Sequence, residues 1–391
     1  MKHSITRRDF VKTPAALAAA AGWAEWTGAA PAASAPGPAS SANAGASAPI
    51  EWRNRRPGMR YRQLGRTGFM ISEIVCGGDP ISPDNYKHVI AAFEMGLNYF
   101  DTAPAYGGGR SEEGYALALH AVGRDHVFLT TKIDPFKESR FSAYLKVYET
   151  LSAAEQCQIL RDTNADIAAR GVTLPSYFGH YDSGQYRQAE MAAIAGVMER
   201  KYGSKINRQK VYVDTILTSI EGSLRRLKTD HVDVMMCPHG AASPAEVRIP
   251  EIYEAFDKLK RQGKVRYLGV SAHNDPAHVL KAAAENGVHS MAMFAYNIMN
   301  REYVEPAIAD AHARNFGMIA MKTSQAVFYP DRSTRPVPER AALLNQTVPG
   351  NLGVHQKAYR LALSNPHLSA VISNMVNEQQ VRENLHVAMR A

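Results

Sequence analysis

Residues 96–107 read GLNYFDTAPAYG, a short apolar run that ends in an aspartate and is followed by a tyrosine. The run 97–102 contains two adjacent aromatic residues and is too short for a helix, which predicts a β-strand. Amphipathic stretches over residues 85–95 and 111–121 predict a helix on either side of it. A strand between two helices favours a parallel sheet.

The same alternation continues along the rest of the chain. Further predicted strands are 74–77, 127–132, 232–238, 265–271, 290–296, 318–322 and 370–374, and further predicted helices are 214–227, 252–262, 277–285 and 302–314. Eight strand–helix units predict an α/β fold, a closed (β/α)8 TIM barrel, rather than an open sheet. An open nucleotide-binding sheet would need a G-x-G-x-x-G turn after its first strand, and Cys76-Gly77-Gly78-Asp79 lacks that spacing.

Two additions to the barrel are expected. An N-terminal β-hairpin over residues 61–72 would have Gly65 and Gly68 at its turn. A segment over residues 135–209, with helical runs at 144–170 and 188–201, is too long for an ordinary loop and forms an insertion after the third strand. Because barrel active sites form at the carboxyl ends of the strands, the insertion is either a lid or substrate-selecting flap, or else a decorative subdomain or an oligomer contact. No ligand spacing around His180 and Asp182 or the three cysteines supports a metal site.

The first residues indicate export rather than folded structure. Residues 1–12 read MKHSITRRDFVK, and an alanine-rich stretch and an Ala/Ser/Pro/Gly run follow. This arrangement resembles a bacterial twin-arginine export signal. We predict a signal peptide over residues 1–35, a linker over 36–58, and the barrel over 59–391. The twin-arginine machinery is then an export partner, the mature protein is periplasmic, and no stable membrane anchor is expected because no cysteine precedes Cys76.

The net charge of +8 is spread along the chain. The densest basic run, residues 53–66, is not part of a known nucleic-acid module with interleaved aromatic residues. The excess charge could favour an anionic cofactor or substrate, and no nucleic-acid partner is predicted.

Four residues at or just after consecutive predicted strand ends carry the catalytic prediction. Asp101, Lys132 and His239 end or follow strands two, three and four, and Tyr106 lies just beyond the second strand. A buried lysine needs a counter-charge, which Asp101 supplies, and the ammonium would lower the pKa of a nearby phenol. Tyr106 would then donate a proton to a carbonyl oxygen that His239 orients, while hydride reaches the carbon. One such residue alone is more often structural; the four together favour catalysis.

At these positions the sequence resembles the aldo-keto reductase family. The matching segments are 61–68 (YRQLGRTG), 96–103 (GLNYFDTA) with Tyr106-Gly107, Thr131-Lys132, His239, Gly269-Val-Ser271, Tyr296-Asn297 and Glu383-Asn384. The resemblance implies that Tyr106 is the general acid, that Lys132 and Asp101 tune it, and that His239 orients the carbonyl. It also implies a small-molecule carbonyl or alcohol substrate and a nicotinamide cofactor, usually NADPH, bound without a Rossmann fold.

The resemblance also implies the cofactor-binding residues. They are Ser271, Asn274, Tyr296, Lys322, Ser373, Asn377, Gln380 and Asn384. The chain departs from the family here, since Asn377 stands where an arginine often meets the 2′-phosphate. NADP is therefore the expected cofactor with NAD left open, and Lys322 or Arg382 is the candidate substitute for that arginine.

These observations predict an exported NAD(P)-dependent oxidoreductase that interconverts a carbonyl and an alcohol in an aldehyde, ketone or sugar. Because no recycled nicotinamide pool is expected in the periplasm, the cofactor would cross the membrane tightly bound to the folded protein. Two alternatives stay open: a non-redox barrel lyase or epimerase that uses Tyr106 and His239 as acid and base, and a low-turnover binding or regulatory barrel.

Overall fold

A computed structural model describes residues 48–171, 185–330 and 334–389. The predicted signal peptide, most of the predicted linker, and His180 and Asp182 lie outside the described residues. Within the described ranges, no helix is both long and apolar enough to span a bilayer.

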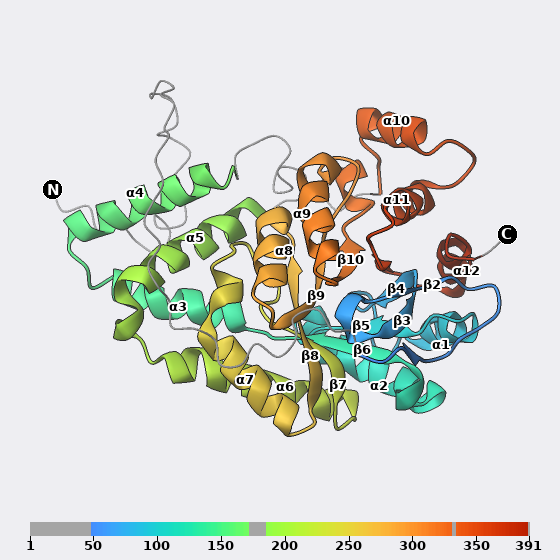
Figure 1. The fold of residues 1–391 in the computed structure, drawn as a ribbon, viewed down its shortest axis with the longest axis horizontal. Helices are drawn as coiled ribbons and strands as arrows, with labels where there is room; N and C mark the ends of the chain where they lie inside the picture. The colour runs from blue at the N-terminus through green and yellow to red at the C-terminus, as the bar shows by residue number, and fades with distance from the viewer. Residues whose placement is uncertain (1–47, 172–184, 331–333, 390–391) are drawn as a thin grey trace. The chain divides into compact units, whose positions relative to one another are not determined.

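Eight parallel strands close into a barrel, which confirms the predicted fold class (Figure 1). They are β4 (Ile74–Gly77), β5 (Tyr99–Asp101), β6 (Phe128–Lys132), β7 (Val232–Met236), β8 (Val265–Ala272), β9 (His289–Ala295), β10 (Gly317–Met321) and β11 (Ala370–Ser373). The strands follow one another around the barrel in chain order, and β11 pairs with β4 to close it.

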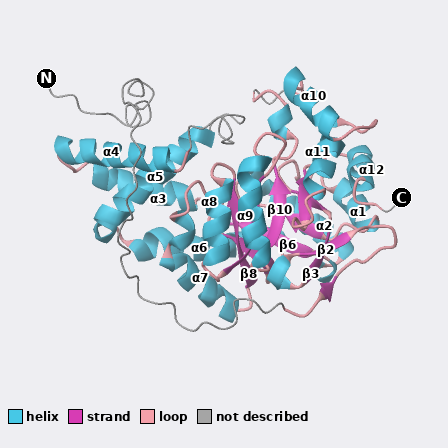
Figure 2. Cartoon of the chain, turned by 45° about the horizontal axis from the view of Figure 1, so that its top comes forward, coloured by secondary structure: helices cyan, strands magenta, loops and turns pink. Residues whose placement is uncertain are grey.

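Helices connect the strands and lie around the barrel that the strands form, as Figure 2 shows with helices in cyan and strands in magenta. They are α1 (Lys87–Glu94), α2 (Arg110–Val122), α6 (Thr215–Leu227), α7 (Pro250–Arg261), α8 (Pro276–Glu285), α9 (Arg301–Ala313), α10 (Pro338–Thr347), α11 (Val354–Leu363) and α12 (Glu378–His386). Strands covered by helices outside and by packed side chains inside are buried on both faces, which explains their nearly continuous apolar runs.

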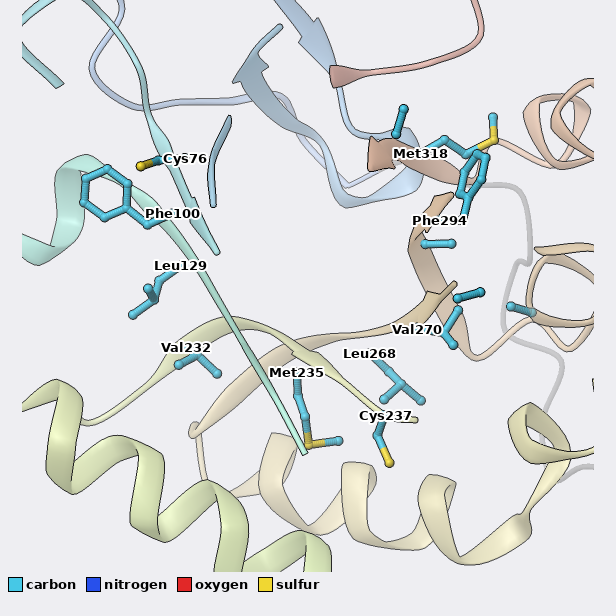
Figure 3. Close-up of a cluster of buried hydrophobic side chains, with 14 of the residues drawn as sticks. Cys76, Phe100, Leu129, Val232, Met235, Cys237, Leu268, Val270, Phe294 and Met318 are labelled. Carbon is cyan, nitrogen blue, oxygen red and sulfur yellow. The ribbon is translucent and has the colours of Figure 1, made fainter. Parts of the chain in front are cut away.

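The core accordingly has two layers. Alternate side chains of each strand point to opposite faces, so Phe128 packs inside the barrel and Leu129 packs against the helices. Figure 3 shows part of the outer layer. Cys76 and Cys237 are buried there as free thiols.

The predicted hairpin is present. β2 (Tyr61–Gln63) and β3 (Phe69–Ser72) pair in an antiparallel manner across the short helix η1 (Gly65–Thr67). Phe69 stacks on Phe128 with ring centroids 4.3 Å apart, so the hairpin covers the amino-terminal end of the barrel interior.

The last residues of the predicted linker are ordered against the barrel. Glu51 and Trp52 form β1, which pairs in parallel with β3. Arg266 forms ion pairs with Glu51 at 2.6 Å and with the buried Asp233 at 2.7 Å. Arg53 forms a further ion pair with Asp233 at 3.2 Å. These ion pairs hold the segment in place.

The insertion after β6 contains α3 (Phe136–Tyr148), α4 (Ala153–Ala169) and α5 (Gln185–Tyr202), with α5 packed against the other two. The helical run predicted over residues 144–170 is in fact two helices. The break occurs because Ser152 caps α4: its hydroxyl accepts a hydrogen bond from the Glu155 backbone, and the Glu155 carboxylate accepts one from the Ser152 backbone.

Candidate active site

The four predicted catalytic residues meet at the carboxyl end of the barrel. Asp101 and Lys132 are the last residues of β5 and β6, His239 follows β7, and Tyr106 opens the short helix η2 (Tyr106–Gly109). Three of them line a cavity of about 390 Å³, and Lys132 lies behind them. Parallel strands bring their carboxyl ends to one rim, which is why residues far apart in sequence meet there.

Lys132 and Asp101 form a buried ion pair. The Lys132 Nζ donates to Asp101 Oδ2 at 2.6 Å and to the Thr102 carbonyl at 2.9 Å. Asp101 Oδ1 is buried and has no hydrogen-bond partner among the described residues. Burial opposes the charged ammonium, but the charge of Asp101 outweighs it and raises the pKa of Lys132. The lysine is therefore held as a cation.

Tyr106 differs from its predicted protonation behaviour. The Lys132 Nζ lies 4.6 Å from the centroid of its ring. Burial raises the pKa of Tyr106 to about 12, and the ammonium of Lys132 only partly offsets that effect. The Lys132 ammonium lowers the pKa of this phenol as expected, but desolvation is the larger influence, so the net pKa is raised. Tyr106 stays protonated at neutral pH, which is the form that a proton donor requires.

His239 has a partner that the sequence prediction missed. Its Nδ1 lies 2.8 Å from Asp134 Oδ1 and 3.0 Å from Oδ2, and its ring meets Tyr106 edge to face at 6.1 Å. Although burial acts against it, the hydrogen bond and charge of His239 lower the pKa of Asp134. A usable signal was present, since Asp134 lies two residues after Lys132 at the same strand end.

Comparison with known proteins identifies the family. The family model described as the aldo/keto reductase family matches residues 77–167 and 197–390. The chain belongs to the aldo-keto reductase family. The stretch between the two matched parts falls inside the insertion, so this aldo-keto reductase carries most of α5 outside the part that matches the family model.

The relatives are distant. The aldo-keto reductase AMT2 of Alternaria alternata is 27% identical over 276 residues, which cover 66% of this chain and 63% of that protein. The chain thus spans less than two thirds of that relative's length. The solved aldo-keto reductase AKR11C1 from Bacillus halodurans superposes with a TM-score of 0.55 at 21% identity, over 85% of this chain and 92% of that one. An aldo-keto reductase from Klebsiella pneumoniae in complex with NADPH superposes with a TM-score of 0.52 at 18% identity, over 84% and 89% of the two chains.

Of the residues predicted to bind the cofactor, Lys322 lines the cavity, at a left-handed φ of 57°. Three others are buried beside it. The Ser271 hydroxyl accepts a hydrogen bond from the Gly240 backbone at 2.8 Å, and the Tyr296 hydroxyl donates to Glu305 at 2.8 Å. Asn274 is fully buried, and its Oδ1 has no partner among the described residues.

The remaining four belong to the segment around α12. Ser373 and Asn384 bond each other at 3.0 Å in the interior. Asn377 caps α12 by accepting from the Gln380 backbone at 2.9 Å, and the Gln380 side chain accepts from the Val376 backbone at 3.0 Å. Their contacts in the structure are thus internal, and their role toward a cofactor stays a prediction.

Other cavity-lining residues were not predicted. They are Asp79, His273, Met293, Met321, Thr323, Ser324, Gln325, His355, Tyr359, Ile372 and Asn374. Burial and the nearby charges of Lys322 and His239 hold the pKa of His273 well below its usual value, so it presents a neutral imidazole. The period of two from Ser271 could have indicated His273 rather than Asn274 as the residue facing the cavity.

The insertion contacts the site from one side. The Lys137 Nζ, on α3, donates to the Gly240 carbonyl at 3.2 Å and to Gln188 of α5 at 3.0 Å. Arg170, at the end of α4, pairs with the buried Asp275 at 2.8 Å. These contacts reach the loops after β7 and β8, so the insertion supports the loops that carry His239 and His273.

Proposed function

We propose that this chain is an exported NAD(P)-dependent oxidoreductase that interconverts a carbonyl and an alcohol. The observation that carries the proposal is the position of Tyr106. Its protonated phenol stands at the cavity between the Lys132 ammonium, 4.6 Å from its ring centroid, and the His239 ring, 6.1 Å away. A donor, a cation and an orienting imidazole around one cavity suit an oxygen that gains negative charge during reaction.

In the direction of reduction, Tyr106 gives its hydroxyl proton to the substrate oxygen as the carbonyl becomes an alcohol. The Lys132 ammonium stabilises the tyrosinate that results, and Asp101 keeps that ammonium charged and in place. His239 orients the substrate oxygen toward the phenol. The nicotinamide cofactor, when bound, supplies or accepts the hydride at the substrate carbon.

The cavity fits a nicotinamide dinucleotide in its chemistry. Polar groups line it from the ends of β10 and β11: Lys322, Thr323, Ser324, Gln325 and Asn374. Buried Asp101 Oδ1, at the cavity, is an acceptor without a partner among the described residues, and an amide group is a suitable donor. The related Klebsiella pneumoniae enzyme was solved in complex with NADPH, which supports the same class of cofactor here.

The choice between NADP and NAD depends on the start of α12. Arg382, in α12, is one of the predicted substitutes for a phosphate-binding arginine, and it forms an ion pair with Glu378 at 3.3 Å. A 2′-phosphate would have to draw Arg382 away from Glu378, whereas NAD makes no such demand. We retain NADP as the first candidate and NAD as the second.

Export rests on the sequence of residues 1–35, with its paired Arg7 and Arg8 before an alanine-rich stretch. Because the twin-arginine route carries folded proteins, the chain would reach the periplasm with its cofactor already bound. Subcellular fractionation tests the first point: the double change Arg7→Lys and Arg8→Lys should retain the protein in the cytoplasm. Native mass spectrometry of the exported protein tests the second, since a mass without a nucleotide contradicts a resident cofactor.

The activity is tested with purified protein, a panel of aldehydes, ketones and sugars, and either nicotinamide, by following absorbance of the reduced cofactor. Tyr106→Phe should abolish most turnover, and the exposed Tyr329→Phe is the matched control. Carbonyl turnover that survives Tyr106→Phe unchanged contradicts the assignment of the proton donor. Substrate consumption by cofactor-free protein would instead support a non-redox barrel enzyme.

A further inference from the structure

Asp134 links three active-site segments. It follows β6, both of its carboxylate oxygens lie within 3.0 Å of the His239 Nδ1, and Oδ2 accepts a hydrogen bond from the Ala105 backbone at 3.3 Å. Ala105 directly precedes Tyr106. The Asp134 and His239 side chains are 18% and 14% exposed, so their contact is largely shielded from solvent. One carboxylate thus holds both the histidine and the segment that carries the tyrosine.

We propose that Asp134 is a positioning residue that fixes His239 with its proton on Nδ1 and its Nε2 directed to the substrate oxygen. The proposal rests on the carbonyl–alcohol chemistry proposed above and adds a role for a residue outside the four predicted ones. An ionised carboxylate only accepts hydrogen bonds, so Nδ1 must be the donor in this contact. Its partner therefore selects the tautomer of the neutral ring, as an aspartate does in a Ser-His-Asp triad.

This tautomer fixes how each charge state of His239 can contact the substrate oxygen. With the proton on Nδ1, a neutral ring offers Nε2 as an acceptor. To donate to a carbonyl oxygen, Nε2 must also carry a proton, which makes the ring an imidazolium. Asp134 then supplies the counter-charge to that cation. Because Tyr106 transfers the proton and His239 only hydrogen-bonds the oxygen, the ring keeps its charge through the step, so reduction and its reverse are both expected to use the charged ring.

Several other groups influence the charge of the histidine. Tyr106 of η2 meets its ring, the charge of the ring acts on Asp101 and His273, and the cations Lys322, Lys137 and Lys132 act on His273 next to it. Asp101 and Lys132 form their own pair, Tyr106 stays protonated, and His273 is neutral. Asp134 is the carboxylate in direct contact with the ring. Its removal should therefore change the tautomer and charge of His239 more than the removal of any other single acidic residue.

The test compares Asp134→Asn with Asp230→Asn in the full chain. Asp230 forms a similar contact with His231 Nδ1 at 2.7 Å, but on the surface, where its side chain is 94% exposed. We expect Asp134→Asn to lower kcat for reduction by about 10- to 100-fold with little change in nicotinamide binding. The alkaline limb of its reduction profile should move down by about one pH unit. Asp230→Asn should change neither, and Asp134→Glu should restore part of the rate.

Nitrogen NMR of ring-labelled histidine provides a readout that needs no turnover, with His239→Gln used to assign the signals. The wild-type protein should show a hydrogen-bonded Nδ1–H for His239, and Asp134→Asn should alter that signal while the signal of His231 stays the same. A wild-type His239 that carries its neutral-form proton on Nε2 overturns the proposal even if the variant fails to fold. An unchanged pH profile of reduction in a folded Asp134→Asn variant also overturns the proposal. Absence of carbonyl turnover in the wild type would instead count against the proposed function, because the NMR result stands apart from it.

Discussion

Replacing Lys132 by methionine tests the buried ion pair at the end of β6. The pair joins Nζ to Asp101 Oδ2 at 2.6 Å, and the two side chains are 2% and 0% exposed. Methionine keeps most of the side-chain volume but removes the charge, so Asp101 stays buried without its counter-ion. Removing one partner of a buried pair lowers the free energy of unfolding by about 3–5 kcal/mol, whereas an exposed pair contributes about 1 kcal/mol or less.

The pH dependence of this loss has a definite sign. Burial raises the pKa of Asp101 even with Lys132 beside it, and loss of the ammonium raises that pKa further. A carboxyl group whose folded-state pKa lies above its unfolded value stabilises the fold at low pH. That contribution disappears as pH rises through the folded-state pKa. The Lys132→Met variant should therefore be less destabilised, relative to the wild type, at about pH 5 than at about pH 8.

Thermal unfolding of the full chain, followed by circular dichroism at both pH values, measures the effect. We expect the Tm of Lys132→Met to fall by roughly 5 °C at about pH 8 and by less at about pH 5. The control is Lys264→Met, which breaks a pair with Glu221 whose side chains are 29% and 42% exposed, and which should move Tm by roughly 1 °C. A fall in Lys132→Met no larger than in the control, or one that grows at low pH, refutes the reasoning.

Four further predictions concern the acid, the cofactor, a histidine pair on α8 and the insertion. Tyr106→Phe should lower kcat by about 10²- to 10⁴-fold while calorimetry shows unchanged nicotinamide binding; a matching loss of binding would mean that the phenol holds the cofactor. Arg382→Ala should raise the Kd for NADPH about tenfold and leave that for NADH unaltered, and equal effects on both would exclude it as the 2′-phosphate ligand. On α8, the hydrogen bond to Asp275 raises the pKa of His278. The His278–Asp275 pair therefore stabilises the fold fully below about pH 6.5, and this stabilisation is lost as pH rises through the raised pKa of His278. His278→Gln should flatten that part of a plot of Tm against pH, whereas Arg170→Met should lower Tm by roughly 5 °C and increase hydrogen exchange in α4.

The barrel was predictable because its strands leave a simple record in the sequence. Each has to bury both faces, so an apolar run such as 317–321 marks it. The internal structure of the insertion was harder to predict, because its helices contact the barrel loops through a few polar contacts such as the ion pair of Arg170 with Asp275. The end of α3 was missed for a local reason: Ser152 starts a new helix through a capping box that hydrophobic periodicity does not report.

The catalytic residues were predictable to the extent that they end strands. Asp101 and Lys132 are the last residues of apolar runs, where an ionisable group stands out. Tyr106 and His239 lie beyond the strand ends and were also predicted, whereas Asp134 and His273 were not. Whether His273 or Asn274 faces the cavity depends on how the chain leaves β8, and the protonation of Tyr106 depends on burial, which the chemistry of its neighbours alone does not give.

The geometry of the site follows from the position of β6 between its neighbours. Lys132 and Asp134 lie two residues apart at the end of β6, with Lys132 behind the residues that line the cavity and Asp134 against His239. Lys132 pairs with Asp101 after β5 and Asp134 with His239 after β7, so one segment places a cation toward one neighbour and an anion toward the other. The registers that align Asp101 with Thr130, and Lys132 with Met236, fix both distances at once. A shift of one residue in either pairing would turn the side chains of one strand to the opposite face, so the apolar pattern that specifies the barrel also specifies its catalytic contacts.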